Sequence, residues 1–166
     1  MVNLTRIYTR TGDDGTTALG DFSRTSKTDP RLAAYADTNE ANAHLGVAIA
    51  TGELDEDVVA VLTRVQNDLF DVGADLATPL QESYEYPPLR VEQRWVDELE
   101  ADCDAYLART EKLRSFILPG GTPGAAQAHL ARGLFGGVGG GEDERGVIGE
   151  RLARLETEAV DDVQHA

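Results

Sequence analysis

Apolar residues recur along the middle of this chain at the spacing of an amphipathic helix. The clearest repeat alternates intervals of four and three residues and comprises Val58, Leu62, Val65, Leu69, Val72 and Leu76. Because a helical turn takes 3.6 residues, these positions share one face. The pattern therefore predicts a core-facing helix from about Asp55 to Ala77, which Pro79 ends.

An earlier segment carries helix signals at both of its ends. Asp29 is a favourable N-cap, Pro30 suits the first turn, and Gly52 suits the position after the last turn. We expect a helix from about Pro30 to Thr51. One of its seams is rich in small residues, which favours close helix packing, and comprises Ala34, Thr38, Ala41, Leu45 and Ala48.

The neighbouring seam of the same helix holds two asparagines, Asn39 and Asn42, where a plain bundle would place Leu or Ile. A buried amide needs hydrogen-bond partners. The seam therefore faces a ligand, a subunit interface or a polar network, or else it is simply exposed to solvent.

Two further helices are predicted in the second half of the chain. One runs from about Val91 to Thr110, and its apolar side comprises Val91, Trp95, Leu99, Cys103 and Tyr106. Cys103 is expected to pack there as a small apolar residue. The other helix opens near Pro123 and continues through Arg132.

The composition changes abruptly after Arg132. Residues 133–141 hold six glycines in nine positions, and each glycine costs a helix about 1 kcal/mol relative to alanine. We therefore expect the helix to stop there. Residues 142–166 have a thin apolar content, which predicts a short acidic helix with some disorder.

These elements predict an all-α fold, a bundle of about four helices followed by an atypical tail. We divide the chain into a domain over 1–132 and a glycine-rich, acidic tail over 133–166. Residues 1–28 are expected to be irregular or briefly extended. Leu4, Ile7 and Tyr8 are candidates to anchor that segment to the core.

Composition excludes several classes of function. The net charge of −15 and a pI near 4.4 argue against non-specific binding of nucleic acid or of an anionic membrane, which requires a basic face. No apolar run approaches the roughly 18 residues of a membrane helix. With one cysteine and no signal peptide, we expect a soluble, cytoplasmic protein without an internal disulfide.

No metal-ligand spacing is present in the sequence. The three histidines are far apart, and we expect hydrogen-bonded helix positions rather than metal ligands for His44 and His129, while His165 lies in the tail.

The strongest candidate for chemistry is the segment Thr9–Thr17, which reads T-R-T-G-D-D-G-T-T. Gly12 and Gly15 permit positive φ and leave backbone N–H groups uncovered. Such N–H groups and threonine hydroxyls make a concave anion site, and Arg10 and Lys27 supply positive charge. The segment predicts either a cradle for a triphosphate or an ordinary polar turn. It is not a Walker A loop, because G-x-x-x-x-G-K-[ST] is absent.

Four stretches in register resemble the PduO-type corrinoid adenosyltransferases. They read R-I-Y-T-R-T-G-D-D-G-T-T at 6–17, K-T-D-P-R-L-A-A-Y-A-D-T-N-E-A-N at 27–42, Q-N-D-L-F-D-V-G-A-D-L-A-T-P at 66–79 and S-F-I-L-P-G-G at 115–121. The similarity covers residues 4–132.

The resemblance implies a homotrimer with five helices per subunit and active sites between neighbouring subunits. It implies transfer of the 5′-deoxyadenosyl group of ATP to cob(I)alamin, with triphosphate released. It also implies that the ATP phosphates and Mg²⁺ are held by Thr9, Arg10, Gly12, Asp14, Gly15, Thr16, Thr17 and Lys27. Individual metal ligands are not assigned.

Phe116 matches the aromatic residue that, in this family, presses on the lower face of the corrin and displaces its lower axial ligand. The resemblance therefore implies a catalytic role for Phe116, beside Arg10 and Lys27. The alternative is an ordinary core phenylalanine.

Two departures from the family are visible. Asn39 stands where the family has an Asp that pairs with an arginine across the subunit boundary, so a hydrogen bond replaces a charged pair. The Arg-Arg-Ala-Glu-Arg and Asn-Arg-Leu-Ser-Asp stretches are also missing after Arg132. A frameshift near Arg132 would explain their loss, because arginine codons of a GC-rich gene often become glycine codons out of phase.

This loss keeps other functions open. A corrinoid-binding escort without catalysis would keep Phe116 but not the ATP-binding arginines, and an inactive truncated product would keep neither activity. A plain helical interaction domain with a fortuitous loop would bind neither ligand.

Overall fold

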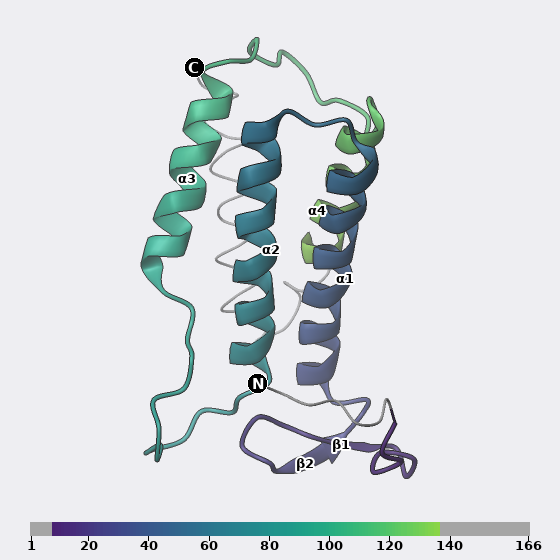
Figure 1. Ribbon diagram of the computed structural model, residues 1–166, viewed down its shortest axis with the longest axis vertical. Helices are drawn as coiled ribbons and strands as arrows, with labels where there is room; N and C mark the ends of the chain where they lie inside the picture. The colour runs from purple at the N-terminus through teal and green to yellow at the C-terminus, as the bar shows by residue number, and fades with distance from the viewer. Residues whose placement is uncertain (1–7, 137–166) are drawn as a thin grey trace.

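In the part of the chain that the structure describes, four helices form an up-and-down bundle, and a small β-hairpin caps one end (Figure 1). The computed structural model describes residues 8–136. Its elements are β1 (Thr16–Ala18), β2 (Arg24–Ser26), α1 (Pro30–Thr51), α2 (Glu56–Leu76), α3 (Gln93–Leu107) and α4 (Pro123–Gly136). The predicted all-α class is confirmed. The expectations for Leu4, Ile7, His165 and the tail helix over 142–166 lie outside the described residues.

The ends of α1 form where the local signals predicted them. The Asp29 carboxylate accepts a hydrogen bond from the Arg31 amide at 2.9 Å, and the Gly52 amide donates to the Ala48 carbonyl at 2.8 Å. α2 follows after Asp55, with acidic residues in its first turn, where they favour the positive end of the helix dipole. The predicted bounds of these two helices are thus confirmed within one residue.

The core lies between α1, α2 and α4. The small-residue seam of α1 is buried, with Ala41 and Ala48 fully inaccessible, and it allows close approach. Where the end of α1 meets the start of α4, a Cβ added to Gly52 would lie 2.7 Å from the Cα of Gly124. Close-packed interiors of this kind leave no room for larger side chains. The apolar repeat predicted for α2 is confirmed, since Leu69, Val72 and Leu76 are buried.

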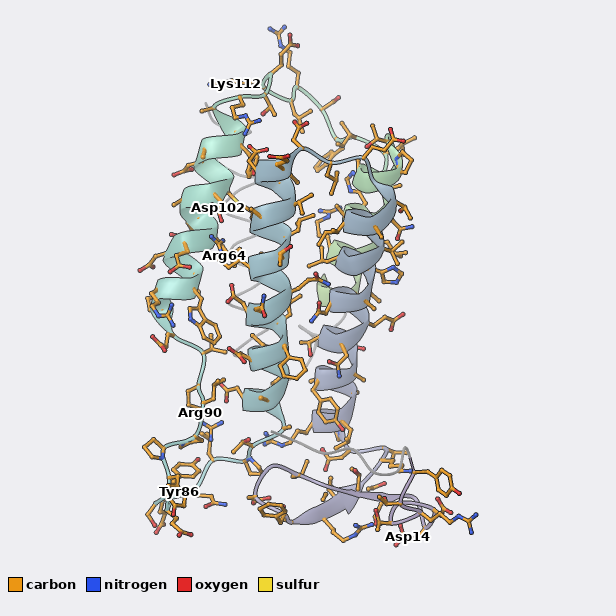
Figure 2. The ribbon with its side chains drawn as sticks, in the orientation of Figure 1. Asp14, Arg64, Tyr86, Arg90, Asp102 and Lys112 are labelled. Carbon is orange, nitrogen blue, oxygen red and sulfur yellow. The ribbon has the colours of Figure 1, made fainter. Side chains whose placement is uncertain are left out.

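α3 is held mainly by one aromatic side chain and by ion pairs. Trp95 is its only buried residue, and it packs with Ala34, Val72 and Leu76. The Arg64 guanidinium of α2 contacts the Asp102 carboxylate of α3 (Figure 2). Helix α3 is shorter at both ends than predicted.

The expectation that Cys103 packs in the core is wrong, because its side chain is exposed. Local desolvation, and then the carboxylates of Asp102, Asp104 and Glu100, raise the pKa of its thiol. Cys103 is therefore not an activated nucleophile.

Helix α4 continues past Arg132 to Gly136, so the expected stop at Arg132 is wrong. A single glycine, Gly133, interrupts the better helix formers, and its cost of about 1 kcal/mol is small enough for neighbouring packing to offset. Ala131 is buried against Leu45 and Leu69, and Leu134 is half-buried. None of the described helices is long and apolar enough to cross a membrane.

The segment before α1 was expected to be irregular or briefly extended, and its described part is. β1 and β2 pair antiparallel with Thr16 opposite Ser26, Thr17 opposite Thr25 and Ala18 opposite Arg24. The hairpin lies at the end of the bundle where α1 begins and α2 ends (Figure 1).

Candidate functional site

The loop before β1 folds into two successive tight turns. The Asp13 amide donates to the Arg10 carbonyl at 3.5 Å, and the Gly15 amide donates to the Gly12 carbonyl at 3.2 Å. Gly15 has φ of 82° and Arg10 has φ of 62°, the left-handed region that L side chains rarely adopt. An added Cβ at Gly15 would meet nothing within 4 Å. Glycine is thus required there by backbone conformation rather than by space.

Lys27 lies directly against this loop. Its amide donates to the Gly15 carbonyl at 2.9 Å, because the hairpin register continues past Thr16 and Ser26. A Cβ added to Gly12 would lie 3.1 Å from the Lys27 Nζ and 2.8 Å from the Thr16 carbonyl oxygen. Any larger residue at position 12 would push the ammonium group away. The predicted proximity of Lys27 to the glycine loop is observed.

Arg24 organises the loop, and sequence reasoning missed it. Its Nη2 donates to the Thr11 carbonyl at 2.6 Å, and its Nε donates to the Thr16 hydroxyl at 3.0 Å. The same guanidinium lies 3.5 Å from the Asp14 carboxylate. One arginine therefore joins both turns to β2. The only signal in the sequence was a basic residue three positions before Lys27.

The loop holds two acidic residues, Asp13 and Asp14, and Asp14 is the one whose carboxylate accepts hydrogen bonds within the loop. One of its oxygens accepts from the Thr16 amide at 3.0 Å and from the Thr16 hydroxyl at 2.7 Å. These bonds, and then the charge of Arg24, lower the pKa of the Asp14 carboxyl, which keeps it ionised. In the part of the chain described, no group of three His, Cys, Asp or Glu side chains could hold a metal ion. A single carboxylate suits Mg²⁺ that is held largely by substrate phosphates.

The remaining predicted residues of the loop share its surface. Thr9 and Thr11 hydroxyls are 3.0 Å apart, Arg10 lies over the Tyr8 ring at 5.5 Å, and Thr17 pairs with Thr25 in the hairpin. The structure thus gathers into one hairpin all the residues that were predicted to bind phosphate. What it assembles is a polar surface with three cationic side chains, those of Arg10, Arg24 and Lys27.

The asparagine seam of α1 divides into two parts. The side-chain amide of Asn42 donates to the backbone carbonyl of Gln66 at 2.9 Å, and the side-chain amide of Gln66 donates to the backbone carbonyl of Asn42 at 3.0 Å. Of the alternatives stated above, Asn42 therefore belongs to a polar network between α1 and α2. Asn39, in contrast, is exposed in the chain.

Phe116 is not brought to the hairpin within one chain. It belongs to the segment joining α3 to α4, at the opposite end of the bundle (Figure 1). Its side chain is 87% exposed, and that of Leu118 is 91% exposed. The alternative of an ordinary core phenylalanine is wrong for the single chain.

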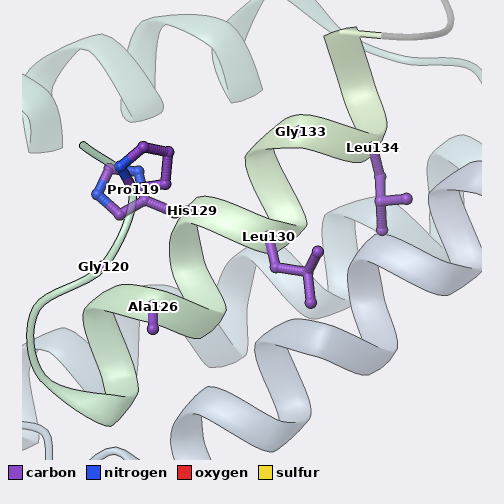
Figure 3. A pocket seen from close by; sticks show the side chains of 7 residues that line it. All are labelled: Pro119, Gly120, Ala126, His129, Leu130, Gly133 and Leu134. Atoms are coloured by element: carbon purple, nitrogen blue, oxygen red, sulfur yellow. The ribbon is translucent and has the colours of Figure 1, made fainter. Parts of the chain in front are cut away.

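An open apolar groove lies beside the segment that carries Phe116. It has a volume of about 590 Å³ and is lined by Pro119, Gly120, Ala126, His129, Leu130, Gly133 and Leu134 (Figure 3). The groove and Phe116 together present carbon rather than charge. On the other side of α4, Gln127 lies 3.3 Å from the ring nitrogen of His44, which was expected to be a hydrogen-bonded helix residue.

Comparison with known proteins gives one consistent result. The profile of the cobalamin adenosyltransferase family matches residues 7–135. The corrinoid adenosyltransferase of Mycobacterium tuberculosis strain H37Rv is 59% identical over 131 residues, which cover 79% of this chain and 68% of that protein. The corrinoid adenosyltransferase of Bacillus subtilis is 39% identical over 130 residues, with 76% and 65% covered.

Solved structures agree with the sequence relatives. A phenylalanine-to-alanine variant of a PduO-type ATP:corrinoid adenosyltransferase from Lactobacillus reuteri, complexed with cobalamin and ATP, superposes with a TM-score of 0.71 at 29% identity. The match covers 94% of this chain and 78% of that one. An arginine-to-lysine variant of the Lactobacillus reuteri enzyme, complexed with ATP, gives a TM-score of 0.66 at 31% identity, with 93% and 78% covered.

Proposed function

Because this chain belongs to the cobalamin adenosyltransferase family, we propose that it transfers the 5′-deoxyadenosyl group of ATP to cob(I)alamin, giving adenosylcobalamin and triphosphate. Its enzyme class is therefore ATP:corrinoid adenosyltransferase. The observation that carries the proposal is the glycine-threonine loop of residues 9–17, folded against Lys27 and Arg24.

In this reaction Co(I) forms a bond to C5′ of ATP while the C5′–O bond breaks, and triphosphate leaves with the bonding electrons. Negative charge therefore grows on the triphosphate in the transition state. Donors and cations fixed in advance stabilise such charge without reorganisation. Lys27, Arg10 and the amides around Gly12 and Gly15 would supply them, and Thr9, Thr16 and Thr17 would add hydroxyls.

Asp14 would help to hold Mg²⁺, which neutralises part of the phosphate charge when bound. Its lowered pKa keeps the carboxylate available at neutral pH. This overall acidic chain, with a net charge of −15, attracts cations to its surface and repels free ATP. The magnesium complex of ATP, with its lower charge, is thus the favoured substrate form.

Phe116 would meet the lower face of the corrin. Its exposure and the apolar groove beside it suit a large ring system, because contact there removes carbon surface from water. Pressed against the ring, Phe116 would displace the lower axial ligand, and the enclosed site would exclude water from the reactive Co(I).

Three copies are proposed to complete the sites. The polar loop and Phe116 lie at opposite ends of one bundle, so a site that needs both takes them from different copies. Asn39, exposed in the middle of α1, would form a hydrogen bond across this boundary where relatives use a charged pair. A cytoplasmic location remains a prediction.

The second candidate function is a corrinoid-binding escort without catalysis. It is favoured by one observation: the Phe116 segment is present, whereas the Arg-Arg-Ala-Glu-Arg stretch is absent from the sequence. The missing stretch would follow Arg132, where we divide the chain into domain and tail. A frameshift there would have removed the ATP-binding arginines, which favours the escort. Resequencing of the locus tests the frameshift, since an Arg-rich stretch in another frame would support it.

The deciding experiment is an anaerobic assay with chemically reduced cobalamin and Mg-ATP. Formation of the cobalt–carbon bond is followed by absorbance, and triphosphate is measured separately. We expect the two products in equal amounts, and neither without ATP. Binding titrations distinguish the other outcomes: an escort binds cobalamin but not ATP, and a plain interaction domain binds neither.

A further inference from the structure

A cluster of polar contacts among Asp75, Thr78, Tyr84 and Arg90, here called the polar knot, holds the segment between α2 and α3 at the hairpin end of the bundle. Its centre is the Arg90 guanidinium, which pairs with the Asp75 carboxylate at the end of α2. The guanidinium also donates to the Thr78 carbonyl at 2.9 Å and to the Tyr84 hydroxyl at 2.8 Å. Both charged side chains are largely buried, with 28% and 16% of their surfaces exposed.

The other side of the same knot fixes the start of α3. The second Asp75 oxygen accepts from the Val91 amide at 2.8 Å. The Tyr84 hydroxyl accepts from the Gln81 amide at 2.8 Å and lies 3.1 Å from the Pro79 carbonyl, to which it donates. The segment of residues 77–91 is therefore joined to the end of α2 by several hydrogen bonds and an ion pair.

The residues beside the polar knot form hydrogen bonds to the turn of the β-hairpin. The Gly20 amide donates to the Ala77 carbonyl at 2.7 Å, and the Gln81 side chain donates to the Asp21 carboxylate at 3.2 Å. A Cβ added to Gly20 would lie 2.5 Å from the Thr78 hydroxyl. Gly20 and Asp21 thus contact the segment of residues 77–81, in which Arg90 binds the Thr78 and Pro79 carbonyls.

The hairpin in turn carries the loop. Pairing of Ala18 with Arg24 and of Thr16 with Ser26 places the Arg24 side chain on the loop and the Lys27 amide on Gly15. A continuous series of adjacent residues and hydrogen bonds therefore joins Arg90 to the loop at Gly12–Gly15. Figure 2 shows Arg90 and Asp14 at the same end of the bundle.

We propose that Arg90 is a positioning residue for the nucleotide loop, acting through Asp75, the Thr78 carbonyl and the hairpin turn at Gly20, whose amide binds the adjacent Ala77 carbonyl. This inference rests on the proposed function of the loop as an ATP site. Arg90 does not touch the substrate. It fixes the height and angle at which the hairpin presents Lys27 and the loop amides to the triphosphate, so its loss weakens ATP binding.

Arg109 offers a matched control. It pairs with Asp57 across the start of α2, at the opposite end of the bundle from the hairpin. Replacing it by Gln removes an arginine ion pair of α2 without touching the hairpin. Arg90→Gln removes the knot, Arg90→Lys keeps the charge but not the planar fork, and Gln81→Ala keeps the knot but removes one link to Asp21.

The test measures Mg-ATP affinity by calorimetry and amide hydrogen exchange of residues 12–27 in the free proteins. We expect Arg90→Gln to weaken ATP binding by about threefold to thirtyfold and to speed exchange in the hairpin. Arg90→Lys should recover part of both effects, and Gln81→Ala should show a smaller loss. Arg109→Gln should change neither quantity, and cobalamin binding should be unaltered in every variant.

The outcomes distinguish the proposed ATP-binding function of the loop from the positioning role of Arg90. If the wild-type chain fails to bind Mg-ATP, the proposed function of the loop is wrong, while hairpin exchange still reports on Arg90. If the wild type binds ATP and Arg90→Gln binds it equally well with unchanged exchange, the positioning role is overturned. If Arg90→Gln does not fold, Arg90→Lys, which loses the planar fork, overturns the role instead if it shows wild-type affinity and exchange.

Discussion

The two ends of the bundle are built on opposite principles. At the hairpin end, the loop of residues 9–17 is held by hydrogen bonds from Arg24, Lys27 and its own turns. At the other end, no hydrogen bond ties residues 111–121 to the bundle within the part of the chain described, and Phe116 and Leu118 are almost fully exposed. The loop at one end is fixed by hydrogen bonds, and the segment at the other end presents exposed apolar side chains without a cover.

This difference indicates that a single chain can complete the phosphate-binding half of the proposed site but not the half that would contact the corrin. Polar groups that grip phosphate must be fixed in advance, since ordering them on binding would cost affinity. An exposed apolar patch indicates a surface that another molecule covers. We therefore expect changes at the hairpin end to act on ATP binding alone, and changes at the Phe116 end to act on the corrin step.

The largest effect is expected from Phe116→Ala. Full burial of a phenylalanine side chain stabilises a complex by about 1.5–3 kcal/mol, so its loss should lower the rate of cobalt–carbon bond formation by about tenfold to hundredfold. Mg-ATP affinity should not change. Single-turnover absorbance at saturating ATP measures the rate, and a wild-type rate would remove Phe116 from the site.

Lys27→Met is expected to weaken Mg-ATP binding by about tenfold to hundredfold, because a charged hydrogen bond contributes about 1.5–3 kcal/mol. Cobalamin affinity should stay unchanged. Lys112→Met is the matched control, since Lys112 lies at the opposite end of the bundle (Figure 2). Equal ATP affinities for the two variants, measured by calorimetry, would show that Lys27 does not contact phosphate.

Arg24→Gln should act in the same direction but less strongly. Arg24 already satisfies Thr11, Thr16 and Asp14, so its main role is to order the loop. We expect a loss of ATP affinity of about fivefold, with faster hydrogen exchange at residues 11–16. Unchanged exchange with weaker binding would instead indicate that Arg24 contacts ATP directly.

The smallest effects concern stability, at the cluster of charged side chains around Arg64 of α2. Asp68 has an oxygen that is buried without a hydrogen bond, and burial raises the pKa of its carboxyl above 3.8. The ionised form therefore destabilises the fold at neutral pH, and this penalty vanishes as the pH falls through the raised pKa. Asp68→Asn should unfold at the wild-type temperature or slightly above at pH 7, with the difference shrinking toward pH 4.

Asp102→Asn is the counterpart of that variant. Asp102 forms the closest ion pair of Arg64, and a partly exposed pair is worth about 0.5–1 kcal/mol. Its unfolding temperature at pH 7 should fall below that of Asp68→Asn. Calorimetric melting of both variants would contradict the assignment if Asp68→Asn proved the less stable.

Much of the bundle was predictable because its helices carry local signals. Asp29, Pro30 and Gly52 fix the ends of α1, and the regular apolar repeat fixes the buried face of α2. Cys103 was mispredicted for a physical reason. Helical spacing shows which face of α3 is apolar, but not how much of that face another element covers.

Residue types alone singled out the loop as a candidate site, whereas they gave no sign of the side chains that support it. Glycines, threonines and Lys27 announce an anion site by residue type, whereas the contact of Arg24 with the loop depends on the register of two three-residue strands. Such short strands have no measurable alternation. The knot around Arg90 was missed because its bonds go mainly to backbone carbonyls, which any sequence offers.

The most direct test of the central claim, that different copies supply the two halves of the site, is subunit complementation. Lys27→Met and Phe116→Ala chains are unfolded together, refolded as mixed oligomers and assayed with cob(I)alamin and Mg-ATP. We predict activity well above either parent, because in an equal mixture about a quarter of the sites combine an intact loop from one chain with an intact Phe116 from its neighbour. Mixed oligomers no more active than the two parents would contradict the account.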